Sequence, residues 1–439
     1  MTDRTNTNLF HHKTHGSIGI PTLIIAVFWL STLVGAYFVE ISIEALLSDT
    51  IKRAGMNGIL VLAMVPAIQS GTGPNFALPI GIVCGLLAAV CAIELGLTGV
   101  LWLFASIVLS VPFAIIAGFS YGKLLNAVKG SEMTIATYTG FSITALMCLV
   151  WLVIPFNNPQ MGWFMGKGLR ETIQLDAIRG EQILNNFLAL NIRGEILIPT
   201  ENIDGETVIP TIINKVVTNV KVKEVTMPFI MEGVIKPADS IRGIVIPAFN
   251  IGDIKIPTTI GGVITIVSKE NTPRPTVRGG ILIPTGMLLF FGFFVVLAWL
   301  FFKSKTGIAI SAGGINPKFA QASGLNIDRN RILANIFSTI LGAIGIIIYS
   351  QSFGYVQLYT APLMMAFPAV AAILIGGATA SRASAFNAVI GVFLFQGLLT
   401  TALPVANEIF KGTNLSDMMR AIIQNGVILY ALTQIKKAG

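Results

Sequence analysis

Long apolar segments set the first limit on what this chain can fold into. A helix that crosses a membrane needs about 20 mostly apolar residues, and about ten segments meet this requirement. They are residues 20–42, 54–70, 76–96, 98–120, 134–155, 281–302, 332–351, 362–379, 384–404 and 416–434. Only 11% of the residues are charged, about half the share found in soluble domains. We therefore expect an all-α polytopic membrane protein.

Residue types that carry metal or redox chemistry are few. The three cysteines fall inside apolar segments, where cysteine is usually a small core residue, and three histidines form a cluster in the polar N-terminal tail, where side chains are usually solvated. They are Cys84, Cys91, Cys148, His11, His12 and His15. We expect no catalytic residues and no metal site. The basic residues form no stripe interleaved with aromatics, so we expect no nucleic-acid binding.

The lysines and arginines give the spans a direction. Cytoplasmic loops carry an excess of both residue types. With the N-terminus inside, the loops on that side carry Arg4, Lys13, Lys123, Lys129, Lys303, Lys305, Lys318, Arg329, Arg331, Arg382, Lys436 and Lys437. The short outer loops carry only Lys52, Arg53 and Lys411. Both termini should face the cytoplasm of a multi-pass protein of the cell (inner) membrane. The first apolar run is too long for a signal-peptide core, so it should remain as the first helix.

A long polar segment divides the chain into three parts. Residues 1–155 form an N-terminal transmembrane half, residues 156–280 an extracytoplasmic insertion, and residues 281–439 a C-terminal transmembrane half. Apolar residues at three-to-four spacing predict an amphipathic helix over 169–190. This helix either packs on its own domain, or lies on the membrane surface or over the mouth of a pore.

The rest of the insertion is typical of a β-rich domain. Val, Ile and Thr are broken by Gly and Pro, and the phrase at 193–200, Arg-Gly-Glu-Ile-Leu-Ile-Pro-Thr, nearly recurs at 278–285. Each copy predicts a turn glycine, a short strand and a proline that stops it.

If the chain is a transporter, the motifs that it lacks limit the energy sources that it could use. A proton-coupled carrier needs ionisable groups at mid-membrane, and Glu40 and Glu94 lie near span ends. No HExxH, GxSxG or GxxxxGK[ST] motif occurs, so we expect no enzyme activity and no ATP hydrolysis by this chain. A Na⁺-coupled carrier or channel could use a broken helix instead, and the break at 71–79 leaves that alternative open.

The predicted cytoplasmic loop 303–331 contains a helix with clear boundaries. Asn316 can cap a helix whose first residue is Pro317, and Gly324 can end it. Phe319 would then be an apolar side chain on about two turns of helix. The segment is either an ordinary turn between helices or a contact for a separate ATPase subunit.

Residues 303–404 resemble the ribose-type (simple-sugar and branched-chain amino acid) family of ABC importer permeases. That family has a coupling-helix pattern, G-x-N-x-x-A-A-x-x-S-G-I-x-V, matched here by Gly314, Asn316, Ala320, Ser323, Gly324, Leu325 and Ile327. The stretch 367–379 fits its A-x-A-A-V-V-x-G-G-T motif, while residues 54–70 and 98–155 resemble the family more weakly. Two motifs differ, because the family's acidic G-I-D-L-S-V-G phrase is replaced at 73–81 and its later glycine turn at 380–384.

The resemblance implies a permease subunit of an ABC importer for a small polar solute such as a sugar or nucleoside. It implies a second permease subunit, identical or different, two nucleotide-binding ATPase subunits and an extracytoplasmic solute-binding protein. The β-rich domain could dock that binding protein, gate the pore or contact a partner permease, and the sequence does not choose among these. ATP and Mg²⁺ would act on those partner subunits and no cofactor on this chain. The residues expected to contact the ATPase are Asn316, Pro317, Lys318, Phe319, Ala320, Gln321, Ser323 and Gly324.

Amides inside the spans are candidates for the solute path. They are Gln69, Asn75, Asn335, Asn387 and Gln396. A membrane amide is more often a link between helices than a ligand. Gly71 and Gly73 could open backbone carbonyls to the path, or could simply form a packing kink.

Overall fold

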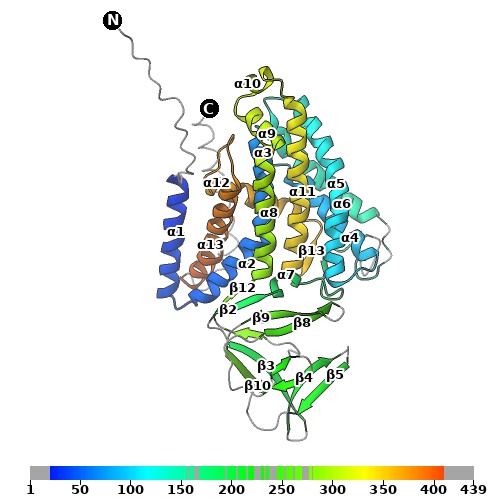
Figure 1. Ribbon diagram of the computed structural model, residues 1–439, viewed down its shortest axis with the longest axis vertical. Helices are drawn as coiled ribbons and strands as arrows, with labels where there is room; N and C mark the ends of the chain where they lie inside the picture. Colours follow the sequence, from blue (N-terminus) through cyan, green and yellow to red (C-terminus); the bar gives the residue numbers. More distant parts are fainter. Residues whose placement is uncertain are drawn as a thin grey trace.

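The computed structural model describes residues 20–409, apart from residues 155, 157, 163–167, 193–194, 204–205, 214–215, 222–228, 232–233, 237–244, 252–253, 261–262, 269–275 and 279. Helices account for most of the described chain (Figure 1). Their bounds are α1 Ile20–Phe38, α2 Ile43–Leu62, α3 Met64–Gln69, α4 Leu78–Glu94, α5 Gly99–Ala127, α6 Glu132–Val153, α7 Ile183–Asn186, α8 Thr285–Lys303, α9 Lys305–Ile315, α10 Pro317–Ala322, α11 Ile327–Phe353, α12 Ala361–Ile375 and α13 Ala385–Ile409.

Six of the described helices are long and apolar enough to cross a membrane: Ile43–Gln69, Gly99–Ala127, Glu132–Val153, Thr285–Lys303, Ile327–Phe353 and Ala385–Glu408. Three shorter apolar helices, Thr22–Phe38, Leu78–Glu94 and Ala361–Ile375, accompany them. The structure is therefore that of a polytopic membrane protein. The count of ten spans and the cytoplasmic termini stay predictions, because residues 1–19 and 410–439, with the tenth span at 416–434, lie outside the described residues.

Helix α11 lies at the centre of the bundle, packed against α2, α4 and α5. Glycines allow the close approach. A Cβ atom added at Gly85 would overlap the carbonyl oxygen of Ala343, and one added at Gly118 would lie 2.8 Å from the Cα of Ile336. Small residues at helix contacts are typical of membrane bundles, because close packing and not the hydrophobic effect holds helices together in lipid. The outer faces of α1, α5, α6 and α8 expose large apolar side chains, as lipid contact requires.

Strands occupy one end of the molecule, opposite α10 (Figure 1). Their bounds are β1 Thr172–Gln174, β2 Ala189–Ile192, β3 Glu195–Ile203, β4 Glu206–Ile213, β5 Val216–Lys221, β6 Phe229–Met231, β7 Val234–Lys236, β8 Val245–Ile251, β9 Ile254–Ile260, β10 Val263–Ser268, β11 Thr276–Arg278, β12 Ile281–Ile283 and β13 Tyr355–Gln357. One sheet has the order β12-β2-β9-β8, another β10-β3-β4-β5 with β11 also paired to β3, and β6 pairs with β7. That these strands lie outside the cell, and the division at 155 and 280, stay predictions.

The start of the insertion is attached to the ends of the helices. Strand β1 pairs antiparallel with β13, which lies between α11 and α12. The amide of Leu169 donates to the carbonyl of Trp151, and the amide of Gly99 donates to the carbonyl of Ile178. We call this the α7 end of the bundle and the opposite end the α10 end.

The predicted helix over 169–190 is wrong. The segment forms β1, a turn, the four-residue α7 and the start of β2. Leu169, Ile173 and Leu175 are nevertheless buried, so the apolar spacing reflects contact with the bundle and not helical geometry. Left-handed backbone at Arg179 and Gln182 prevents a continuous helix here.

Two smaller expectations also need correction, and one helix was missed. The second span begins at Ile43 and not at 54, so Lys52 and Arg53 lie in α2 and not in a loop; Arg53 pairs with Asp49 one turn earlier on an exposed face. Helix α9 was not predicted at all. Pro199 lies inside strand β3 and does not stop it, whereas Pro284 directly follows strand β12, as the repeated phrase predicts.

Candidate functional site

Helices α9 and α10 form a compact hairpin whose two starts are capped by side chains. The Ser304 Oγ accepts a hydrogen bond from the Gly307 amide at 3.2 Å. The Asn316 Oδ1 accepts one from the Phe319 amide at 3.1 Å, and Pro317 is the first residue of α10. Because an N-cap supplies an acceptor that the first turn lacks, this short helix has a defined start at the residue the sequence indicates.

The other end of α10 is closed by backbone hydrogen bonds. The Gly324 amide donates to Gln321 O and the Leu325 amide to Ala320 O, both at 3.0 Å. Gly324 has φ +80°, which glycine adopts without strain, and the pair of bonds is a Schellman motif. Ser323 Oγ also donates to Phe319 O at 3.0 Å. The predicted helix boundaries at Asn316 and Gly324 are confirmed.

The surface of α10 is polar with one large apolar side chain, and α9 exposes Ile308 and Ile315. Ala320 is buried against the bundle, while Asn316, Pro317, Lys318, Gln321, Ser323 and Gly324 are exposed. Phe319 is 67% exposed at the tip of the hairpin. An exposed phenylalanine on a rigid, capped helix has the form of an anchor for a pocket on a partner protein.

The break after α3 is a tight backbone turn. Gly71 and Gly73 have φ +77° and +80°. The Thr72 amide and its Oγ1 both donate to Ala67 O, at 3.3 and 2.8 Å. The turn thus closes on itself, and this carbonyl is not open to a solute.

Asn75 links three parts of the bundle. Its Nδ2 donates to Ser338 Oγ on α11 at 2.9 Å. Its Oδ1 accepts from the Ala77 amide at 3.1 Å and from the Tyr121 hydroxyl on α5 at 3.2 Å. Asn75 is buried, and both its nitrogen and its oxygen form bonds to other helices.

Gln69 and Asn387 belong to a second polar network at the α10 end. The Gln69 Oε1 accepts from Ser311 Oγ at 2.6 Å, and its Nε2 donates to Ala383 O at 2.7 Å. Asn387 Nδ2 donates to Gly376 O at 2.7 Å, and its Oδ1 accepts from Ser384. The network joins α3, α9, α12, α13 and the loop 376–384.

The remaining two predicted amides, Asn335 and Gln396, form none of these contacts. Asn335 Nδ2 donates to Arg331 O of its own helix at 2.9 Å, and its buried Oδ1 has no hydrogen-bond partner among the described residues. Gln396 is buried in the middle of α13. The structure thus gathers Gln69, Gly71, Gly73, Asn75 and Asn387 near the α10 end and leaves Gln396 away from them.

Hydroxyl pairs between helices were not predicted. Thr50 and Thr400 join α2 to α13 at 2.6 Å, and Thr32 and Thr401 join α1 to α13 at 2.7 Å. Single hydroxyls in apolar runs were the available signal, because such groups hydrogen-bond across membrane helices. The hydroxyls of Ser311, Ser338 and Tyr121, which bond to Gln69 and Asn75, were likewise not predicted.

The adjacent glycines at the end of α12 have a packing explanation. A Cβ atom at Gly376 would overlap the backbone oxygen of Asn387, and one at Gly391 would overlap that of Ala372. Gly377 has φ +90°. Glycine is therefore required where α12 and α13 touch through their backbones.

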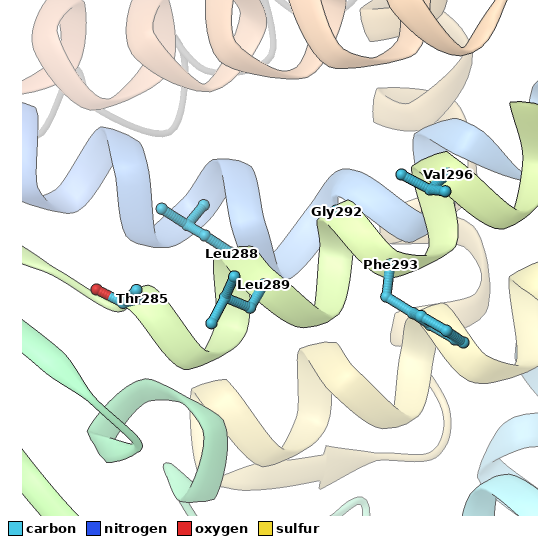
Figure 2. A pocket seen from close by; sticks show the side chains of 6 residues that line it. All are labelled: Thr285, Leu288, Leu289, Gly292, Phe293 and Val296. Carbon is cyan, nitrogen blue, oxygen red and sulfur yellow. The ribbon is translucent and has the colours of Figure 1, made fainter.

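Two surface hollows lie on the described part of the chain. One, of about 370 Å³, is at the α10 end and is lined by residues 71–73, 130–134, 380 and 381. The other, of about 450 Å³, is an apolar groove along α8 between Thr285 and Val296, shown in Figure 2. No group of three or more His, Cys, Asp or Glu side chains within the described residues could hold a metal ion.

A family model described as the permease component of the branched-chain amino acid transport system matches residues 200–432. This range is more than half of the chain.

The chain belongs to this permease family.

The permease motifs at 314–327 and 367–379 both lie within the matched range. That range begins at residue 200, inside the long insertion, whereas the sequence resemblance began at about residue 303. The weaker resemblances at 54–70 and 98–155 lie outside it.

One relative of this permease is described as the nucleoside ABC transporter permease protein NupB of Lactococcus lactis subsp. cremoris. The two chains are 32% identical over 112 residues, which is 25% of this chain and 28% of the relative. The similarity therefore spans less than a third of that relative's length. No solved structure is similar enough to match this permease.

Proposed function

We propose that this permease is the membrane-spanning subunit of an ABC importer for a small polar solute, with nucleosides as the first class to test. The hairpin α9–α10 is the single observation that carries the proposal. It presents the exposed Phe319 on a capped helix, and its sequence matches the coupling pattern of the family. Nucleosides are chosen because the similar Lactococcus permease is described as a nucleoside transporter; sugars are the second class.

The charge distribution supports the direction of the proposed complex. Lys303, Lys305 and Lys318 flank or lie in the hairpin, and Lys129 lies nearby in the α5–α6 loop. An excess of basic residues is typical of the cytoplasmic side. The α10 end would then face nucleotide-binding subunits, which hydrolyse ATP with Mg²⁺. The α7 end would face an extracytoplasmic binding protein, and a second permease, identical or different, would complete the path.

A Na⁺-coupled carrier is the alternative that the helix break suggested. Such carriers coordinate the ion with backbone carbonyls freed by unwound helices. Here the Ala67 carbonyl accepts hydrogen bonds from Thr72 and from Ser70 Oγ. The break thus satisfies its own backbone, which favours the ATP-driven importer.

Solute uptake in whole cells tests the proposal. Cells lacking this chain and cells carrying it would be given radiolabelled uridine, adenosine or ribose. We expect uptake that stops when ATP is depleted and persists when the Na⁺ gradient is collapsed by an ionophore. Uptake that follows the Na⁺ gradient would instead establish the secondary carrier.

A substitution in the hairpin tests the ATPase contact. Phe319→Asp should abolish uptake and release the nucleotide-binding subunit during purification, because the charge cannot enter an apolar pocket. Phe386→Asp is the matched control, since Phe386 is 60% exposed at the start of α13 but lies outside the hairpin. Equal behaviour of the two variants would contradict the assignment.

A further inference from the structure

Gln69, the last residue of α3, contacts two segments that are far apart in the sequence. Its Oε1 accepts from Ser311 of α9 and its Nε2 donates to the Ala383 carbonyl in the α12–α13 loop. An amide can accept through its oxygen and donate through its nitrogen without carrying a charge. The Gln69 side chain thus connects the α9–α10 hairpin to the α12–α13 loop.

The backbone reinforces this connection. A Cβ atom added at Gly314 would overlap the carbonyl oxygen of Gln69 and lie 2.8 Å from the Gly71 amide nitrogen. Gly314 is the penultimate residue of α9, two positions before the Asn316 cap of α10. Displacement of the C-terminal end of α9 therefore also displaces the backbone at the α3 break, because interiors this closely packed transmit displacement.

The segments that Gln69 joins border one hollow. The α10-end pocket of about 370 Å³ is lined by the α3 break at 71–73, by residues 130–134 at the end of the α5–α6 loop and the start of α6, and by Ala380 and Ser381 of the α12–α13 loop. The first wall, at 71–73, follows Gln69 in the chain. The third wall belongs to the loop whose Ala383 carbonyl accepts a hydrogen bond from the Gln69 amide. The glycines at 71 and 73 let the first wall adopt its left-handed turn without strain.

We propose that Gln69 is a positioning residue that transmits displacement of the α9–α10 hairpin to the inner mouth of the permease, the hollow bordered by residues 71–73, 130–134 and 380–381. The inference rests on the proposed function, because ATPase subunits supply the displacement. When the hairpin is pulled, Ser311 moves Gln69, and Gln69 moves both the α3 break and Ala383. Two walls of the mouth then shift together and the hollow widens or closes.

The test uses the assembled transporter, purified with its nucleotide-binding subunits into lipid vesicles. The three native cysteines are replaced by alanine and Ser381→Cys places a thiol at the mouth. The rate at which a water-soluble maleimide labels this thiol is measured without nucleotide and with ATP and vanadate. ATP hydrolysis is measured on the same vesicles. Neither readout requires the solute to be identified.

We expect the labelling rate to differ at least about fivefold between the two states of the reference protein, the lower limit of typical coupling between sites. Gln69→Leu should reduce this ratio to below about twofold while ATP hydrolysis is retained. Ser311→Ala, which removes one of the two bonds and little volume, should give an intermediate ratio, and Gln69→Leu with Ser311→Ala should be no worse than Gln69→Leu alone. Asn126→Leu is the control, because Asn126 also joins helices at the α10 end, through the Asp328 carbonyl at 2.9 Å, but does not touch the hairpin.

Three outcomes would overturn the proposal. Gln69→Leu could keep the full ratio, Ser311→Ala could behave as the reference protein, or Gln69→Leu could lose ATP hydrolysis and assembly together with the ratio, which would make Gln69 a structural residue. Failure of the proposed function is distinguishable from these. In that case the reference protein itself would neither hydrolyse ATP nor change its labelling when ATP is added.

Discussion

Arg331 at the start of α11 forms an ion pair with Glu132, the first residue of α6, and the two side chains are only 9% and 17% exposed. Glu132 also accepts a hydrogen bond from the Gly130 amide at 2.9 Å. The pair joins two helices that are far apart in the sequence and lies beside the hollow at the α10 end, since Glu132 is one of the residues that line it.

Arg331→Met should destabilise the protein by about 2–4 kcal/mol, because a mostly buried carboxylate would lose its charged partner. The measurement is the thermal unfolding of the purified protein in detergent. Lys129→Met is the matched control. Lys129 pairs with Asp328 at 2.6 Å, but both side chains are more than half exposed, so its loss should cost less than about 1 kcal/mol. Equal losses would show that burial does not set the strength of the Arg331 pair.

Gly391→Ala should destabilise the contact of α12 with α13 by about 2–3 kcal/mol, because the added methyl group would overlap the Ala372 carbonyl oxygen. Gly292→Ala is the control, since a Cβ atom at Gly292 has no neighbour within 4 Å. Alanine there should be neutral or stabilise α8 by up to about 1 kcal/mol. Detergent unfolding curves of the two variants compare them directly, and a neutral Gly391→Ala would contradict the close backbone contact.

Asn75→Ala should lower stability by about 1–3 kcal/mol, since Ser338 Oγ and the Tyr121 hydroxyl would lose a buried partner. We expect the KM for the transported solute to stay unchanged. Tyr121→Phe, which removes one of these bonds, should cost about 1 kcal/mol. A raised KM with unaltered unfolding would instead show that Asn75 contacts the solute.

Asn185→Ala should loosen the start of the insertion from the α7 end. Asn185 accepts from Ser352 Oγ at 2.7 Å and donates to Ser352 O at 3.2 Å. Amide hydrogen exchange of residues 169–187 should speed up by about fivefold or more, because local opening becomes less costly by about 1 kcal/mol or more. Residues 43–62 of α2 serve as the internal control and should keep their protection. Unchanged exchange at 169–187 would show that other contacts hold this segment.

The elements that the sequence predicts well are those with a strong local signal. Apolar runs located the helices at 20–38, 78–94 and 99–127, and Asn316-Pro317 with Gly324 located α10, because capping depends on residues a few positions apart. Helix α9 was missed because Lys305 to Ile315 contains small and polar residues with no clear period. The false helix at 169–190 shows the opposite error, since burial against other elements imitated a helical period.

The candidate site was predictable in its residues but not in its connections. The amides Gln69, Asn75 and Asn387 stand out in apolar sequence. Their partners are a serine hydroxyl at Ser338 and carbonyl oxygens at Ala383 and Gly376, and no local pattern distinguishes these from other serines and carbonyls. Only the packing of α3 against α9 and of α11 against the break reveals them.

The attachment of the insertion to α11 has a consequence for how the chain is made. Asn185 and Ser352 are 167 residues apart in the sequence, and β1 cannot pair with β13 until residues 355–357 exist. A ribosome synthesises the N-terminal partner first, so residues 169–187 must wait, with unpaired backbone groups, until α11 has emerged and inserted. The α7 end therefore closes late in biogenesis, and a chain cut short before residue 355 should be recognisable to quality-control proteases by that open end.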